Sequence, residues 1–168
     1  MSILVIFAMM VFMVYITATI CEFGIPISIS NTYYLWHSTN SSGNDRNELL
    51  FTGTMVLSAL TLLPAWIMVS TPYTTFLPFL SVSGMMFVGG AAAYKETLTD
   101  TTHYVSAGIW AVSALIWIIV SKEYAALWIP TLIIVPCFLM NKCKNKTFWL
   151  EMYVVFAMFI AIINKYFN

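Results

Sequence analysis

The chain of 168 residues has a composition that excludes an ordinary soluble domain. Hydrophobic residues make up 61% of it, charged residues only 8%, and its mean hydropathy is +0.87. Soluble domains carry roughly 25% charged residues, and a core of this size could not bury so many apolar side chains. Seven basic residues balance seven acidic ones, so nothing indicates a nucleic-acid partner or a polybasic lipid anchor. We therefore expect an integral membrane protein whose main partner is the lipid bilayer.

Six apolar segments are long enough to cross a bilayer, which takes about 20 residues with a range near 17–25. The predicted spans are residues 3–23, 49–69, 76–94, 103–120, 124–140 and 148–163. Most links between them are short, and short links make successive helices antiparallel neighbours. The expected fold is all-α: a polytopic, up-and-down bundle of six transmembrane helices in a single domain, residues 1–168.

The first segment lacks the basic residues that begin a signal peptide, so we expect it to be retained as a span. The link after it, residues 25–48, is the only sizeable polar link. Hydroxyl, amide and aromatic side chains gather there, among them those of Ser30, Asn31, Tyr33 and Tyr34. This stretch is either a lid or headgroup-recognition segment, or a turn after Pro26 followed by an aromatic anchor.

Small residues mark the third and fourth spans. They are Gly84, Gly89 and Gly90 in the third, and Ala107, Ala111 and Ala114 in the fourth. Small side chains allow helix backbones to approach closely in lipid, where no hydrophobic force drives helices together. We therefore expect these two spans to touch.

Three ionisable residues stand close together where the fourth span begins: Glu96, Asp100 and His103. Spacings of three and four residues place them on one helix face. Such groups are able to hold a transition metal or perform acid–base chemistry. The interpretation we favour is that Asp100 caps the fourth span and that Glu96 belongs to a solvated link. Because zinc sites usually show three or four closely matched ligands, no metal or other cofactor is favoured, and a transition metal at these residues is left open.

Two further carboxylates lie just inside the ends of apolar segments, Glu22 in the first and Glu151 in the sixth. A charge at membrane depth is costly and usually faces the bundle interior or an aqueous cavity. These two residues either line a polar pocket together with the Glu96–His103 cluster or lie at the interface, where the cost fades.

The charges are unevenly divided between the two faces of the predicted bundle. Five of the seven basic residues fall on the face with the first, third and fifth links, and two on the face with both termini. Since Lys and Arg are enriched in cytoplasmic loops, we expect both termini outside. Six of the seven acidic residues share the five-base face, and only Glu123 is opposite. Polar chemistry is therefore expected to open on one side of the membrane.

Two motifs resemble the DRAM/Sfk-type family of six-span membrane proteins. The stretch "IPISISNTYY" follows the first span, and "HYVSA" begins the fourth. The chain looks closer still to uncharacterised six-span membrane proteins of Bacteroidetes-type bacteria and their phages, and this resemblance implies a bacterial inner membrane. DRAM-type proteins often carry Asp after the Ile-Ser pair, where this chain has Asn31. The resemblance implies a membrane regulator or lipid-associated protein rather than a defined reaction.

The expected function is that of a non-enzymatic membrane protein that binds a lipid, a small ligand or a protein partner through a one-sided polar pocket. Its candidate lining residues are Glu22, Ser30, Asn31, Tyr33, Tyr34, Glu96, Asp100, His103 and Glu151. The alternative is an intramembrane metal-dependent hydrolase. A small transporter ranks last, because it would need ionisable residues near the midplane of the membrane. No catalytic residue is assigned, and homo-oligomerisation is left open.

Overall fold

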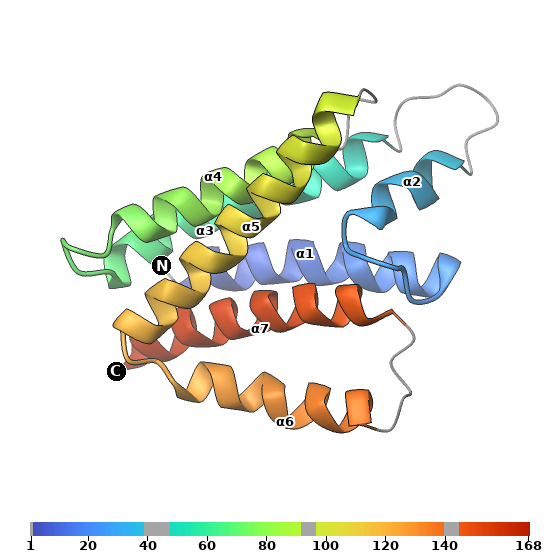
Figure 1. Cartoon of the computed structure of the whole chain (residues 1–168). Helices are drawn as coiled ribbons and strands as arrows, with labels where there is room; N and C mark the ends of the chain where they lie inside the picture. Colours follow the sequence, from blue (N-terminus) through green and yellow to red (C-terminus); the bar gives the residue numbers. More distant parts are fainter. Residues whose placement is uncertain (1, 39–47, 92–96, 140–144) are drawn as a thin grey trace.

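The computed structural model describes residues 2–38, 48–91, 97–139 and 145–168, and within these ranges the chain is helical, with no strand (Figure 1). The helices are α1 (Ser2–Phe23), α2 (Asn31–Ser38), α3 (Glu48–Val69), α4 (Phe76–Ala91), α5 (Thr97–Val120), α6 (Ala125–Leu139) and α7 (Lys146–Phe167). The all-α prediction is confirmed. Four helices, α1, α3, α5 and α7, are long and apolar enough to cross a membrane, and α4 is a shorter apolar helix.

Two details of the sequence prediction were wrong, the N-cap of the fourth span and the structure of the first link. The helix of the fourth span begins at Thr97, before the predicted His103, so Asp100 lies inside its first turns and is not the N-cap. The link after the first span was expected to be a polar loop, yet it contains α2. This helix forms because Ser28 Oγ accepts a hydrogen bond from the Asn31 N–H at its start, and because the buried ring of Tyr33 packs on Phe51 of α3, with ring centroids 6.3 Å apart.

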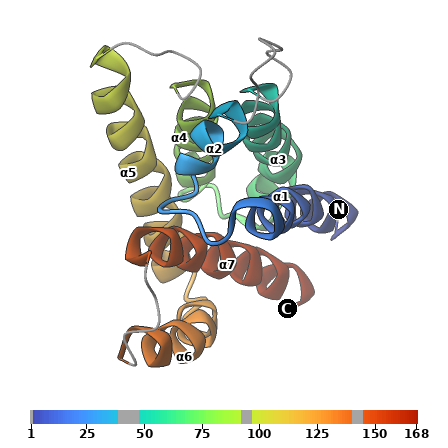
Figure 2. The same ribbon diagram turned by 90° about the vertical axis from the view of Figure 1, so that its right-hand side faces the viewer.

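Helices α1, α3, α4, α5, α6 and α7 run in alternating directions along the bundle (Figure 1). The N-terminus of α1 and the C-terminus of α7 lie at the same end of the bundle, and α2 lies near the opposite end (Figure 1). Helix α3 packs between α1 and α4, and α4 packs against α5. Helix α7 contacts α1, α3, α5 and α6, and in the end-on view it separates α1 from α6 (Figure 2).

Large apolar side chains cover the outside of the bundle as well as its core. Trp66 of α3 and Trp117 of α5 are fully buried and meet edge to face, with ring centroids 5.4 Å apart. On the outer surface, Val14, Leu132 and Tyr104 are each at least 66% exposed. An apolar exterior of this extent is what a bundle surrounded by lipid requires.

The predicted contact between the third and fourth spans is confirmed at Gly84 of α4. A Cβ atom there would lie 2.7 Å from the carbonyl oxygen of Ser106 and 2.7 Å from the backbone nitrogen of Trp110, both on α5. The neighbouring Ser81 donates a hydrogen bond from its hydroxyl to the carbonyl oxygen of Trp110, at 3.0 Å. The two backbones approach this closely only because residue 84 has no side chain.

We predict that Gly84→Ala lowers the free energy of unfolding by about 1–3 kcal/mol, because the new methyl group forces α4 and α5 apart. Gly90→Ala on the same helix is the matched control, since a Cβ at residue 90 has nothing within 4 Å. It should be neutral or stabilising by up to about 1 kcal/mol, the gain in helix propensity. Thermal unfolding in mild detergent measures both, and equal melting temperatures for the two variants would contradict the close packing.

Candidate functional site

The segment between α1 and α2 crosses the first two turns of α7. Helix α1 ends at Gly24, which has a φ of +76° and donates its N–H to the carbonyl oxygen of Ile20 at 2.9 Å. Glycine takes up this left-handed conformation without strain, so the chain leaves the helix sharply here. The residues that follow are not helical until Asn31.

Three hydrogen bonds at alternate residues join this segment to α7. Asn145 Nδ2 donates to the carbonyl oxygen of Ile25 at 2.6 Å, and the N–H of Phe148 donates to that of Ile27 at 3.1 Å. The N–H of Ile29 then donates to Glu151 Oε2 at 2.5 Å. Phe148 lies in the first turn of α7, so its N–H has no acceptor within the helix. The carbonyl oxygen of Ile27 is its acceptor, and this bond also pairs the backbone of the irregular segment.

Helix α2 is held on α1 by two side-chain hydrogen bonds, one from Tyr15 to Thr32 and one from Trp36 to Thr19. Tyr15 OH donates to Thr32 Oγ1 at 2.7 Å, and Thr32 Oγ1 donates to the carbonyl oxygen of Ile29 at 2.5 Å. Farther along, Trp36 Nε1 donates to Thr19 Oγ1 at 2.9 Å, and Thr19 Oγ1 donates to the carbonyl oxygen of Tyr15. Buried polar groups that are all paired fix one arrangement of the helices around them.

An apolar groove of about 480 Å³ runs along α1 beside this network. Its lining comes from α1, α2 and α3 and consists of Phe7, Met10, Val11, Val14, Tyr15, Ala18, Trp36, Leu50 and Thr54. It opens on the outer surface of the bundle, where Met10 is 59% and Val14 66% exposed. Tyr15 and Trp36 therefore belong both to the polar network and to the wall of the groove.

Six of the predicted site residues lie at this end of the bundle, namely Glu22, Ser30, Asn31, Tyr33, Tyr34 and Glu151. Tyr33 is buried, and Tyr34 is 54% exposed on α2. The hydroxyls of Ser28 and Ser30 are 3.0 Å apart. Glu151 is half-buried, and Glu22 is exposed in the last turn of α1. Glu151 thus contacts the predicted recognition segment, through the backbone of Ile29.

The predicted cluster at the start of the fourth span falls largely outside the described part of the chain. Glu96 lies outside the described residues, as does the side chain of Asp100. His103 is half-buried on α5, and its ring centroid lies 5.8 Å from that of Tyr104. Among the side chains that the structure describes, no three His, Cys, Asp or Glu residues come together as a metal site.

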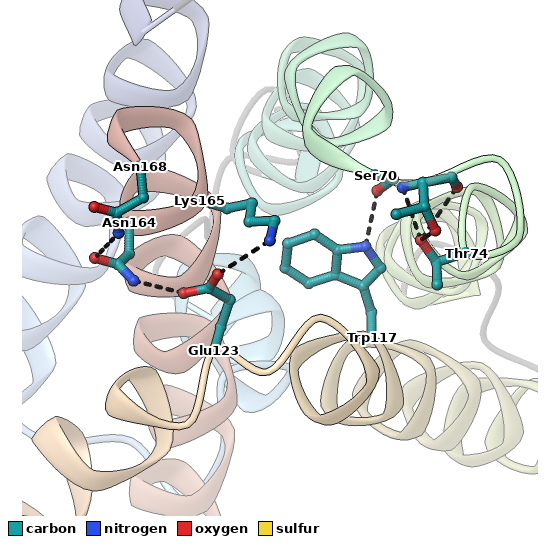
Figure 3. A network of polar contacts seen from close by, with 8 residues as sticks. Ser70, Thr74, Trp117, Glu123, Asn164, Lys165 and Asn168 are labelled. Carbon is teal, nitrogen blue, oxygen red and sulfur yellow. Dashed lines mark hydrogen bonds and ion pairs between the residues drawn. The ribbon is translucent and has the colours of Figure 1, made fainter.

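A second polar cluster, at the opposite end of the bundle, is centred on Glu123 (Figure 3). Its side chain is 9% exposed and reaches α7, where Asn164 Nδ2 lies 2.5 Å from Oε2 and Lys165 Nζ lies 3.7 Å from Oε1. Asn168 extends the cluster by donating from Nδ2 to Asn164 Oδ1 at 3.1 Å. Glu123 was expected only as the lone acidic residue of this face, whereas it joins the α5–α6 turn to the end of α7.

The α5–α6 turn directs Glu123 toward α7. The N–H of Glu123 donates to the carbonyl oxygen of Ile118 at 3.0 Å, and that of Lys122 donates to Ile119 at 3.1 Å. Lys122 has a φ of +62°, so these bonds form the helix-ending turn that normally uses glycine at this position. The contacts of this cluster join the α5–α6 turn to the C-terminal end of α7.

Two residues of the α1–α2 network were not identified from the sequence: Tyr15 and Thr19. Both stand within an apolar run, where a single hydroxyl group is common and does not by itself indicate a site. Their spacing of four residues places them on one helix face, and that face is buried. A pair of buried hydroxyls at this spacing is the signal that would have indicated a polar partner for α1.

We predict that Thr32→Val lowers the free energy of unfolding by about 1–3 kcal/mol, because it leaves the buried Tyr15 hydroxyl without its acceptor. Thr61→Val on α3 is the matched control, since the Thr61 hydroxyl bonds only to carbonyl oxygens of its own helix. That change should stay within about 0.5 kcal/mol. Denaturant titration in detergent measures both, and equal stability of the two variants would show that the α1–α2 network is not required.

No protein-family model matches the chain, and no curated protein or solved structure matches it either. The function is therefore inferred from the geometry of the α1–α2–α7 end of the bundle.

Proposed function

We propose that this chain is a non-enzymatic integral membrane protein that binds one lipid acyl chain in the groove between α1, α2 and α3. The length of the groove is the observation that carries the proposal. Its wall on α1 extends from Phe7 to Ala18, which at 1.5 Å per residue is about 16 Å. The hydrocarbon core of a bilayer is about 30 Å thick, so the groove matches the depth of one leaflet.

The chemistry of the groove also suits a hydrocarbon chain. Its two aromatic residues with polar atoms, Tyr15 and Trp36, direct those atoms to Thr32 and Thr19. They therefore offer apolar ring surface to a ligand in the groove. Burial of each methylene group against such a wall stabilises a bound chain by about 0.8 kcal/mol relative to water, and less relative to lipid.

Helix α2 is suited to lie at the level of the lipid headgroups. Trp and Tyr are enriched at the membrane–water interface, and α2 carries Trp36 in the wall of the groove and the exposed Tyr34. A lipid whose chain occupies the groove would then have its headgroup near α2. The predicted recognition segment, with Ser30 and Asn31, belongs to the same end.

The proposal includes six crossings of the membrane. Helices α4 and α6 contain no charged residue, although they span only 16 and 15 residues. Helices shorter than the hydrocarbon core are accommodated by local thinning of the bilayer. The alternating direction of α1, α3, α4, α5, α6 and α7 supports this arrangement, because crossing by all six places both termini on one side (Figure 1). The charge bias supports placing that side outside the membrane, which we propose to be a bacterial inner membrane.

Cysteine accessibility tests this topology. In a variant without the three native cysteines, we introduce a single cysteine at Tyr73, at Tyr124, at Tyr34 or at Lys146. All four residues are exposed. A membrane-impermeant maleimide should label residues 73 and 124 in intact cells, and residues 34 and 146 only after permeabilisation. Labelling of 73 and 124 from different sides would contradict the six crossings, and the reverse pattern would contradict the orientation.

Filling the groove tests lipid binding. We predict that Val14→Trp reduces the phospholipid retained per protein roughly tenfold, which corresponds to the loss of about two buried methylene groups. Val112→Trp is the matched control, because Val112 is 55% exposed on α5 and Val14 is 66% exposed on α1. Native mass spectrometry after detergent exchange measures retention.

The wild-type chain and Val112→Trp should both retain about one phospholipid, the expectation for a single groove. Equal retention by all three proteins would locate the lipid elsewhere. Absence of retained lipid from the wild-type chain would contradict the proposed function.

A further inference from the structure

The side chain of Glu151 is placed unusually for a carboxylate in a predicted membrane helix. Its hydrogen-bond donor is the backbone N–H of Ile29, in an irregular segment that is distant in sequence. The carboxylate is half-buried, and Ile29 is only 3% exposed. A buried backbone N–H needs an acceptor, and an ionised or highly polar oxygen is the strongest one available.

A continuous series of bonds leads from Glu151 to the groove. The N–H of Ile29 is bound to Glu151, while its carbonyl oxygen accepts the hydroxyl of Thr32, the second residue of α2. Thr32 in turn accepts the hydroxyl of Tyr15, whose side chain lines the groove. One peptide segment thus connects a carboxylate on α7 to a groove residue on α1.

The position of α2 determines the shape of the groove at this end. Trp36 lines the groove and is held by Thr19 of α1. The start of the helix follows directly on the segment that α7 holds. Helix α2 is therefore fixed at its start by α7, through Ile29, and farther along by α1.

We propose that Glu151 is a positioning residue, which holds α2 as the end wall of the groove by accepting the hydrogen bond from Ile29. Without an acceptor at residue 151, the Ile29 N–H must find another partner, and the segment must shift to reach one. Helix α2 then moves with it, and the end of the groove opens. The effect on lipid rests on the proposed function, whereas the effect on α2 does not.

Two substitutions at residue 151 separate the hydrogen bond from packing. Glu151→Gln keeps a carbonyl oxygen at the same distance along the side chain, and Glu151→Leu has similar bulk without an acceptor. Glu123→Leu is the distant control, because it removes a buried carboxylate at the other end of the bundle. Its destabilising effect should leave α2 where it is.

The position of α2 is measured first, by spin-label distances in detergent without added lipid. The labels are attached to cysteines at Tyr34 of α2 and Leu60 of α3, both exposed, in a chain without its native cysteines. The parent protein, Glu151→Gln and Glu123→Leu should give the same narrow distance distribution, and Glu151→Leu a broader or shifted one. An unchanged distribution in Glu151→Leu overturns the proposal, as does a Gln variant that behaves like the Leu variant.

Lipid retention is measured second, with phosphatidylethanolamine of defined chain length as the probe. Glu151→Leu should retain roughly tenfold less than the parent protein, and Glu151→Gln should restore retention. If the parent protein binds no lipid while Glu151→Leu still displaces α2, the proposed function fails and the positioning role stands. If Glu151→Leu displaces α2 but retains lipid like the parent, α2 is not the end wall, and that part of the proposal is overturned.

Discussion

The structure of the α1–α2–α7 end of the bundle depends on one constraint. A backbone that leaves its helix within or near hydrocarbon must find hydrogen-bond partners in the protein. The chain between α1 and α2 finds them in the first two turns of α7, which itself begins with N–H groups that lack intrahelical acceptors. The segment therefore supplies hydrogen-bond acceptors to the start of α7, and α7 supplies hydrogen-bond partners to the backbone of the segment. Because the bonds involve alternate residues, the segment is held in one register, and α2 begins at a fixed place above α1.

This constraint links the polar and apolar parts of the site. The same two side chains, Tyr15 and Trp36, complete the network that fastens α2 and present their rings to the groove. A groove formed only by aliphatic side chains on two helices would have walls but no fixed end. Here the end is fixed by hydrogen bonds, which are directional and give a definite geometry to a surface that would otherwise merge with the surrounding lipid.

Much of the fold could be predicted from the sequence, because long apolar runs and small residues reflect local chemistry. The all-α class, the placement of α1, α3 and α7, and the contact at Gly84 followed from such patterns. The start of α5 and the existence of α2 did not, since both depend on what the polar residues meet in space. Glu151 was recognised as a candidate, but its partner is a backbone N–H, which every residue except proline carries and which no sequence pattern distinguishes. Glu123 was underestimated because its partners come from α7, far along the chain.

The hydrogen bond between Ile29 and Glu151 can form only after α7 has been synthesised. The two residues are 122 positions apart, and one of them lies on α7, which is synthesised after α1 to α6. During synthesis, α1 and the segment after it must therefore wait for α7 before their backbone is satisfied, and this long-range closure is intrinsically slow. A chain interrupted before α7 would leave the N–H of Ile29 without Glu151 as its acceptor. Assembly of this end of the bundle is therefore complete only when α7 has packed on the α1–α2 segment.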